Sequence, residues 1–203
     1  MPRVARQKSP TEIYHVMARG INRDYIFKTD EEKEHYLEIL GDTKSNSDFE
    51  LYAYVMMGNH IHLLIKESSD DIGNIMKRIG IRYAAWYNKH YDRVGHLFQD
   101  RFKSEAIIDE KQFLITLRYI MQNPVKSKLC KIPSSYRWSS WSDYMSRGGL
   151  TDTNFALQIF SLNAGNQIEE FRKFIDIKTD EECLDFDEKP VNEKNMRTVP
   201  ENT

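Results

Sequence analysis

The apolar positions of this 203-residue chain recur with period two in some stretches and with helical spacing in others. Period two, or a short apolar run between turn residues, predicts strands over residues 13–18, 49–56, 60–66 and 101–108. Apolar residues at helical spacing predict one helix between the first two strands and another between the last two.

Capping residues mark where the predicted helices begin. Thr29 or Asp30 is placed to cap the first helix, which we expect to end within residues 41–48, and residues 68–71 begin the second. Asp109 starts a third helix, with Gln112 at capping-box spacing. We expect this third helix to stop at Asn123-Pro124, because proline disfavours helical backbone in the residue before it.

The order is therefore β-α-β-β-α-β followed by a helix, which predicts a ferredoxin-like α+β fold with an antiparallel sheet. Residues 152–160 and 167–177 predict two further short amphipathic helices. We divide the chain into a basic N-terminal arm (1–11), a main domain (12–148), a helical extension (149–178) and an acidic tail (179–203). Few large apolar residues occur in the tail, so we predict that it is disordered.

Two histidines begin the third predicted strand, directly after Gly58-Asn59, which reads as a hairpin turn. Side chains alternate along a strand, so His60 and His62 share one face and Ile61 lies on the other. Two imidazoles on a rigid strand supply half of a metal site. The simpler alternative is a strand that carries two histidines by chance, and partners elsewhere in the chain decide between these readings.

The third predicted helix offers such partners. Tyr119 and Asn123 are four residues apart and therefore lie on one helical face. If that face covers the histidine side of the sheet, a phenol and an amide oxygen lie beside the imidazoles. The alternatives are a packing tyrosine and an Asn that ends the helix. His15, on the neighbouring strand, either supports a metal ligand or packs as a hydrogen-bonded strand residue.

Composition and charge narrow the function classes. No apolar run reaches membrane-spanning length, and the two cysteines fit no zinc-finger spacing, so we expect a soluble protein of a reducing cytoplasm. Residues 151–203 carry 6 Lys+Arg and 12 Asp+Glu, which leaves 23 and 19 of the totals of 29 and 31 for residues 1–150. The first 150 residues are thus mildly basic, which permits a polyanionic partner.

Five groups of motifs occur in a fixed order over about residues 12–145. They are Tyr14-His15-Val16 with Arg19-Gly20, Met57-Gly58-Asn59-His60-Ile61-His62-Leu63-Leu64, Gly95-His96-Leu97-Phe98-Gln99-Asp100-Arg101-Phe102-Lys103-Ser104, Arg118-Tyr119-Ile120 with Asn123-Pro124-Val125, and Trp138-Ser139-Ser140. Together they resemble the single-tyrosine transposases with a His-hydrophobe-His (HUH) signature. The resemblance is closer to the REP-associated tyrosine transposases, which favour Asn at the position of Asn123.

The resemblance implies a transposase and endonuclease that nicks and rejoins single-stranded DNA at hairpin-containing ends. His60, His62 and Asn123 would hold a divalent cation, Mg²⁺ or Mn²⁺, that polarises the scissile phosphate. Tyr119 would attack the phosphorus and form a 5′-phosphotyrosine intermediate, which keeps the phosphodiester energy for rejoining. The resemblance leaves open whether the protein acts as a homodimer or as a monomer.

Basic residues beside these motifs are the expected DNA contacts, together with aromatic residues able to stack on unpaired bases. They are Arg19, Arg23, Lys77, Arg78, Arg82, Arg101, Lys103 and Arg118.

Two other classes of function stay open. A catalytically inactive hairpin-binding protein would keep the fold without strand transfer, although the intact His60, His62, Tyr119 and Asn123 argue against it. A zinc hydrolase would also use the two histidines, but the sequence offers no Glu-x-x-His or Cys partner nearby. For the transposase we expect a cytoplasmic location, at the bacterial nucleoid when bound to DNA, and no contact with a membrane.

Overall fold

The computed structural model describes residues 7–161, 163–177 and 183. Its strands are β1 (Ile13–Arg19), β2 (Glu50–Met56), β3 (His60–Lys66) and β4 (Lys103–Ala106). Its helices are α1 (Asp30–Ser47), α2 (Ile72–His90), α3 (Glu110–Lys126), α4 (Trp141–Ser146), α5 (Thr153–Phe160) and α6 (Gln167–Asp176), with short 3-10 turns η1 (Ile21–Arg23) and η2 (Pro133–Ser135). The predicted disorder of the tail concerns residues that lie, apart from Cys183, outside the described part of the chain.

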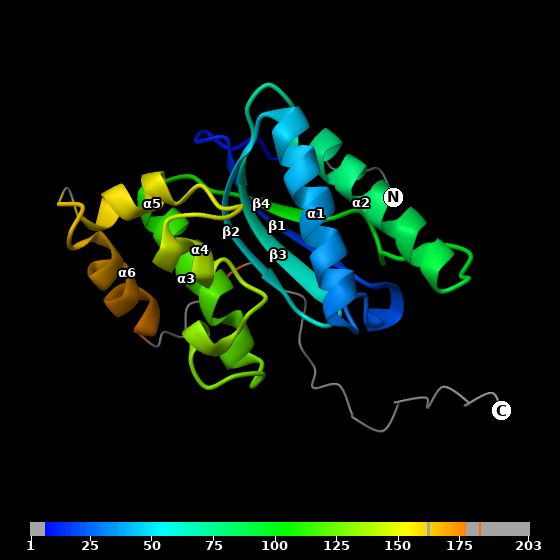
Figure 1. The fold of residues 1–203 in the computed structure, drawn as a ribbon. Helices are drawn as coiled ribbons and strands as arrows, with labels where there is room; N and C mark the ends of the chain where they lie inside the picture. The colour runs from blue at the N-terminus through cyan, green and yellow to red at the C-terminus, as the bar shows by residue number, and fades with distance from the viewer. Residues whose placement is uncertain (1–6, 162, 178–182, 184–203) are drawn as a thin grey trace.

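The four strands form one antiparallel sheet in the order β2-β3-β1-β4. Helices α1 and α2 cover one face of this sheet, and α3 to α6 lie on the other side (Figure 1). This arrangement confirms the predicted ferredoxin-like α+β fold with an extra helix after the fourth strand.

Alternation along the strands divides the apolar residues between two cores. Ile61, Leu63 and Ile65 of β3 pack in the core under α1 and α2. Leu64 joins the second core, which contains Leu117 of α3 and residues of α5 and α6. The histidine face of β3 therefore lies on the same side of the sheet as α3.

Side-chain caps fix the starts of α1 and α3 where the sequence predicts them. Thr29 accepts a hydrogen bond from the N–H of Glu32, whose carboxylate accepts one from the N–H of Thr29, so a complete capping box begins α1. Asp109 caps α3 through the N–H of Gln112. Helix α1 continues to Ser47, near the end of the segment in which we expect it to stop.

Two predicted boundaries are wrong. Helix α3 does not stop at Asn123-Pro124 but continues to Lys126, because the N–H of Ser127 still donates to the carbonyl of Asn123 and only the bond from residue 124 is lost. Strand β4 has four residues instead of the predicted eight. Its ladder ends where the N–H of Ile108 turns to the side chain of Gln112 at the start of α3.

The helical extension packs on α3. Phe171 of α6 is fully buried and stacks on Tyr144 of α4, with ring centroids 4.3 Å apart. The amide nitrogen of Gln122 on α3 donates to the carbonyls of Ile175 and Ile177 at the end of α6. The two helices predicted for the extension are thus confirmed, and they support the outer side of α3.

Candidate active site

A hairpin turn places the two histidines at the start of β3. Gly58 and Asn59 form the turn, and the N–H of Met57 donates to the carbonyl of His60 over 2.8 Å. The imidazoles of His60 and His62 leave the same face of β3, with ring centroids 5.0 Å apart. Both residues are buried. The pair therefore lies inside the protein, between the sheet and what covers it.

Helix α3 covers the pair and brings Tyr119 and Asn123 to it. The phenol ring of Tyr119 lies edge-on to His62, with centroids 5.6 Å apart, and 5.9 Å from the ring of His15. The amide nitrogen of Asn123 lies 3.5 Å from Nε2 of His62. The amide oxygen of Asn123 is buried and has no hydrogen-bond partner within the described residues. The two candidate groups found on β3 and on α3 thus form one site.

Each imidazole of the pair is held at its Nδ1 atom. Nδ1 of His60 lies 2.6 Å from the side-chain oxygen of Asn59, which can only accept, so His60 carries its proton there. Nδ1 of His62 lies 3.0 Å from Nε2 of His15. Burial lowers the pKa of His62 well below 6.5, and the neighbouring His60 and His15 lower it further. His62 is therefore neutral at physiological pH, the form that binds a metal.

The donor set fits a divalent cation. The two imidazoles offer ring nitrogens, and the buried oxygen of Asn123 offers a third protein donor once its amide turns toward them. Imidazole together with carbonyl oxygen and water is compatible with Mn²⁺ or Mg²⁺. No group of three His, Cys, Asp or Glu side chains that could hold a metal occurs in the part of the chain that the structure describes. Among those residues, the amide oxygen of Asn123 is the candidate third donor beside the two histidines.

Three of the predicted DNA contacts lie near the site. Arg19 ends β1 directly opposite His60 in the β1–β3 ladder and is buried. Lys103 is exposed on β4 and lies on the histidine face of the sheet. Arg23 lies in η1, where its carbonyl accepts a hydrogen bond from Asn59 beside the turn. Arg19 and Lys103 therefore place positive charge on the histidine face of the sheet, and Arg23 lies beside the turn through its backbone.

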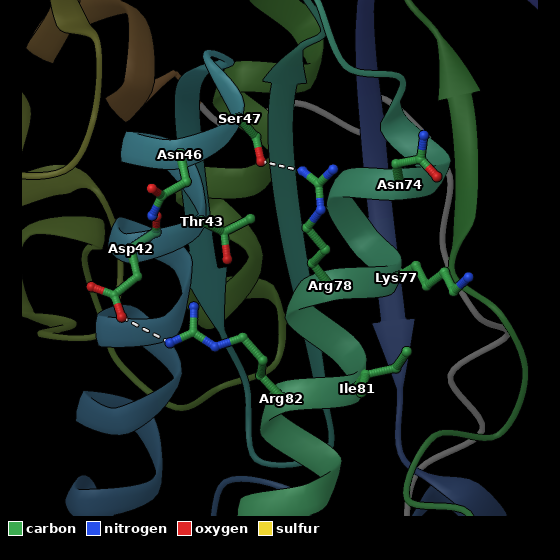
Figure 2. Close-up of a pocket in the computed structure, with 9 residues that line it drawn as sticks. All are labelled: Asp42, Thr43, Asn46, Ser47, Asn74, Lys77, Arg78, Ile81 and Arg82. Atoms are coloured by element: carbon green, nitrogen blue, oxygen red, sulfur yellow. Dashed lines mark hydrogen bonds and ion pairs between the residues drawn. The ribbon is translucent and has the colours of Figure 1, made fainter.

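Three others lie on the opposite layer. Lys77, Arg78 and Arg82 line a groove of about 440 Å³ between α1 and α2. Figure 2 shows Arg78 reaching the hydroxyl of Ser47 and Arg82 reaching the carboxylate of Asp42. The sheet separates this groove from His60 and His62, so the structure does not bring these three residues to the site.

The remaining two face elsewhere. Arg101 lines a cavity of about 390 Å³ with Phe98, Phe102 and residues of α2. The guanidinium of Arg118 lies 4.4 Å from the ring centroid of Phe174, on the side of α3 that faces α6. Although Arg118 precedes Tyr119 in the sequence, successive helical side chains diverge by about 100°. It therefore does not share the face of the candidate nucleophile.

Lys126 is a residue of the site that sequence reasoning missed. Its ammonium nitrogen lies 4.9 Å from the ring centroid of Tyr119. The signal was present, because residues seven apart lie on one face of a helix. The prediction that α3 ends at Asn123-Pro124 placed Lys126 outside the helix. Its positive charge lies beside the phenol.

A four-stranded ferredoxin-like sheet with a histidine pair facing a helical tyrosine and asparagine defines the class of protein. The sequence profile described as "Transposase IS200 like" matches residues 9–123. This match covers more than half of the chain, so the chain belongs to the IS200-like transposase family. The resemblance drawn from the motifs is thereby confirmed.

The chain is also similar to individual proteins. The chain is 27% identical over 127 residues to the REP-associated tyrosine transposase of Escherichia coli (strain K12), which covers 62% of this chain and 73% of that protein. Its fold is similar to the structure of a REP-associated tyrosine transposase bound to a REP hairpin, with a TM-score of 0.60, 22% identity, and coverage of 76% of this chain and 96% of that one. A solved structure from Deinococcus radiodurans R1 aligns with a TM-score of 0.42, 17% identity, and coverage of 63% of this chain and 98% of that one. In the described residues, no helix is long and apolar enough to cross a membrane.

Proposed function

We propose that this protein nicks and rejoins single-stranded DNA next to a hairpin, with Tyr119 as the nucleophile. The observation that carries the proposal is the meeting of Tyr119 and Asn123 with His60 and His62 across the sheet and α3. All four residues come from one chain, so the proposed site is complete in a monomer.

The histidines and Asn123 would hold a divalent cation, Mg²⁺ or Mn²⁺, which when bound polarises the scissile phosphate and stabilises charge on its oxygens. Nε2 of each histidine and the oxygen of Asn123 are the proposed donors. His60 and His62 are suited to this task because each is buried and each has its Nδ1 atom engaged by a neighbour. The sheet and these contacts at Nδ1 keep both rings from turning away from the proposed cation.

Tyr119 carries out the covalent step in this proposal. Its phenolic oxygen attacks the phosphorus, the bond to the 3′ oxygen breaks, and the proton balance closes when the phenol gives up its proton and the leaving oxygen gains one. The products are a 5′-phosphotyrosine and a free 3′-OH. A second 3′-OH can then attack the phosphotyrosine and release Tyr119, so strands are rejoined without ATP.

Lys126 supplies positive charge at the nucleophile. A free phenol ionises near pH 10 and is a weak nucleophile at neutral pH. An ammonium group beside the ring favours the ionised form and attracts the phosphate. The contact of Lys126 with the ring of Tyr119 supports this role.

The proposed substrate is a DNA hairpin with an adjoining single strand. The support is the REP hairpin bound by the relative of similar fold, and the basic character of residues 1–150. Arg19, Arg23 and Lys103 are the proposed contacts to the DNA backbone near the site, where they would position the scissile phosphate.

A nicking assay tests this function. Oligonucleotides that carry a hairpin from the DNA flanking the gene are incubated with protein and Mn²⁺, beside oligonucleotides of equal composition without a hairpin. We expect nicking of the hairpin substrate alone, lost with chelator and in His60→Ala. Tight hairpin binding with no nicking of any substrate would favour the alternative, a catalytically inactive hairpin-binding protein.

A further inference from the structure

His15 links the metal-facing histidine to a carboxylate. It is fully buried in the middle of β1, where it pairs with Leu64 of β3 on one side and with Glu105 of β4 on the other. Its Nε2 atom lies 3.0 Å from Nδ1 of His62. Its Nδ1 atom lies 3.8 Å from the carboxylate of Glu105, which is an ion-pair distance longer than a hydrogen bond.

When the rings of His15 and His62 are both neutral, only one placement of their protons satisfies the contacts that join Asn123, His62, His15 and Glu105. A histidine that binds a metal through Nε2 must offer the lone pair of that atom. His62 therefore carries its proton on Nδ1. The amide nitrogen of Asn123 beside Nε2 of His62 agrees with that, because it can only donate. His15 must then accept at Nε2 and carry its own proton on Nδ1, facing Glu105, whose negative charge favours that tautomer.

We propose that His15, aided by Glu105, is a positioning residue that fixes the tautomer and the ring orientation of His62 so that Nε2 of His62 faces the cation. The inference rests on the metal site of the proposed function. Partners at the second nitrogen of a ligating histidine set its orientation and its strength as a donor. Asn59 occupies the equivalent position for His60, 2.6 Å from its Nδ1.

The alternative is that His15 only fills space. Its ring stacks on that of His62, with centroids 5.2 Å apart and planes 24° from parallel. The two roles predict different rankings of substitutions. His15→Phe keeps a ring but has no acceptor, whereas His15→Gln loses the ring and keeps an acceptor near the position of Nε2.

The first readout is the affinity for Mn²⁺ alone, measured by titration calorimetry on the full chain without DNA. We expect His15→Phe to weaken Mn²⁺ binding by about 10- to 100-fold, the usual effect of removing such a partner. His15→Gln should recover most of that loss, and Glu105→Gln should weaken binding less than His15→Phe. Equal losses in His15→Phe and His15→Gln, in proportion to their losses of thermal stability, would overturn the proposal in favour of packing.

The second readout needs no metal. Nitrogen-15 spectra of the histidine rings of the metal-free protein, at a pH where the rings are neutral, report which nitrogen carries each proton. We expect His62 and His15 both to be protonated at Nδ1, and His62 to lose this preference in His15→Phe but not in His15→Gln. A wild-type His62 protonated at Nε2 would contradict the proposal.

His60→Ala separates failure of this inference from failure of the metal site. If wild type binds Mn²⁺, His60→Ala does not, and His15→Phe binds as wild type does, then the site stands and the role of His15 is wrong. If wild type and His60→Ala bind Mn²⁺ equally, the proposed site itself is wrong, and the inference falls with it.

Discussion

The ring of Tyr119 on α3 lies edge-on to the ring of His62 on β3, with 5.6 Å between their centroids. The two residues are far apart in sequence, and the contact exists because α3 crosses the face of the sheet that α1 and α2 leave open (Figure 1). The candidate site depends on this crossing. It places a phenol, a group that can form covalent intermediates, beside the neutral imidazole of His62.

Divalent metal should stabilise the folded protein through the two histidines. A ligand that binds only the folded state, at a hundred times its dissociation constant, adds about 2.7 kcal/mol of stability. We expect Mn²⁺ to raise the melting temperature of wild type and to leave that of His60→Ala unchanged, with Asn123→Ala in between because it removes an uncharged donor. Thermal denaturation with and without chelator measures this. An equal rise in wild type and His60→Ala would place the metal elsewhere.

The two basic surfaces should differ in their effect on DNA binding. Lys103→Gln should weaken binding of a hairpin oligonucleotide at every sequence and lower the salt dependence by about 0.7 in the log–log slope, the value for one phosphate contact on a single strand. The matched change Arg82→Gln should alter neither quantity, because Arg82 is paired with Asp42 on the opposite layer. Fluorescence anisotropy over a range of salt concentrations measures both. A larger effect of Arg82→Gln than of Lys103→Gln would indicate that the DNA binds in the α1–α2 groove instead.

The helical extension should contribute to the stability of the main domain. Phe171→Ala removes a fully buried ring stacked on Tyr144, so we expect a loss of about 3–5 kcal/mol in the free energy of unfolding. Phe155→Ala is the matched control, since Phe155 is 42% exposed and should cost less. Urea denaturation followed by circular dichroism gives both values. An unchanged free energy in Phe171→Ala would mean that α6 is dispensable for the fold.

High pH should destabilise the core under α1 and α2. Burial raises the pKa of Tyr36 and Tyr83 above the ordinary value of 10, and raises that of Tyr87 to about 12. The unfolded chain releases these protons near pH 10 and the folded protein keeps them, so stability falls as the pH rises above 10. Urea denaturation at a series of alkaline pH values measures the fall, and Tyr83→Phe should make it shallower. Stability that stays constant through pH 10 would contradict the burial of these phenols.

The elements of the site were accessible from sequence because each depends on a local rule. Strand alternation puts His60 and His62 on one face of a strand. Helical spacing puts Tyr119 and Asn123 on one face of a helix. The caps at Thr29 and Asp109 follow from side chains that can accept from the first free N–H groups of a helix. The order of the predicted strands and helices then gives the ferredoxin-like fold, which the similarity to a solved structure supports.

What sequence could not supply depends on tertiary contacts. Lys77, Arg78 and Arg82 have the charge of DNA contacts, but only the packing of α2 against α1 shows that they line a groove across the sheet from the histidines (Figure 2). Sequence does not reveal the role of His15, because its contact with His62 on β3 depends on strand register. Pro124 was misleading, since a helix tolerates the loss of one hydrogen bond near its end.

The most direct test of the account is a covalent link between Tyr119 and DNA. End-labelled hairpin oligonucleotide, Mn²⁺ and protein are combined and resolved on a denaturing gel, with Tyr119→Phe and the matched control Tyr91→Phe, which lies on the opposite layer. The account predicts a labelled protein adduct in wild type and Tyr91→Phe that is absent in Tyr119→Phe and after chelation. An adduct that persists in Tyr119→Phe would contradict it, because another residue would then be the nucleophile.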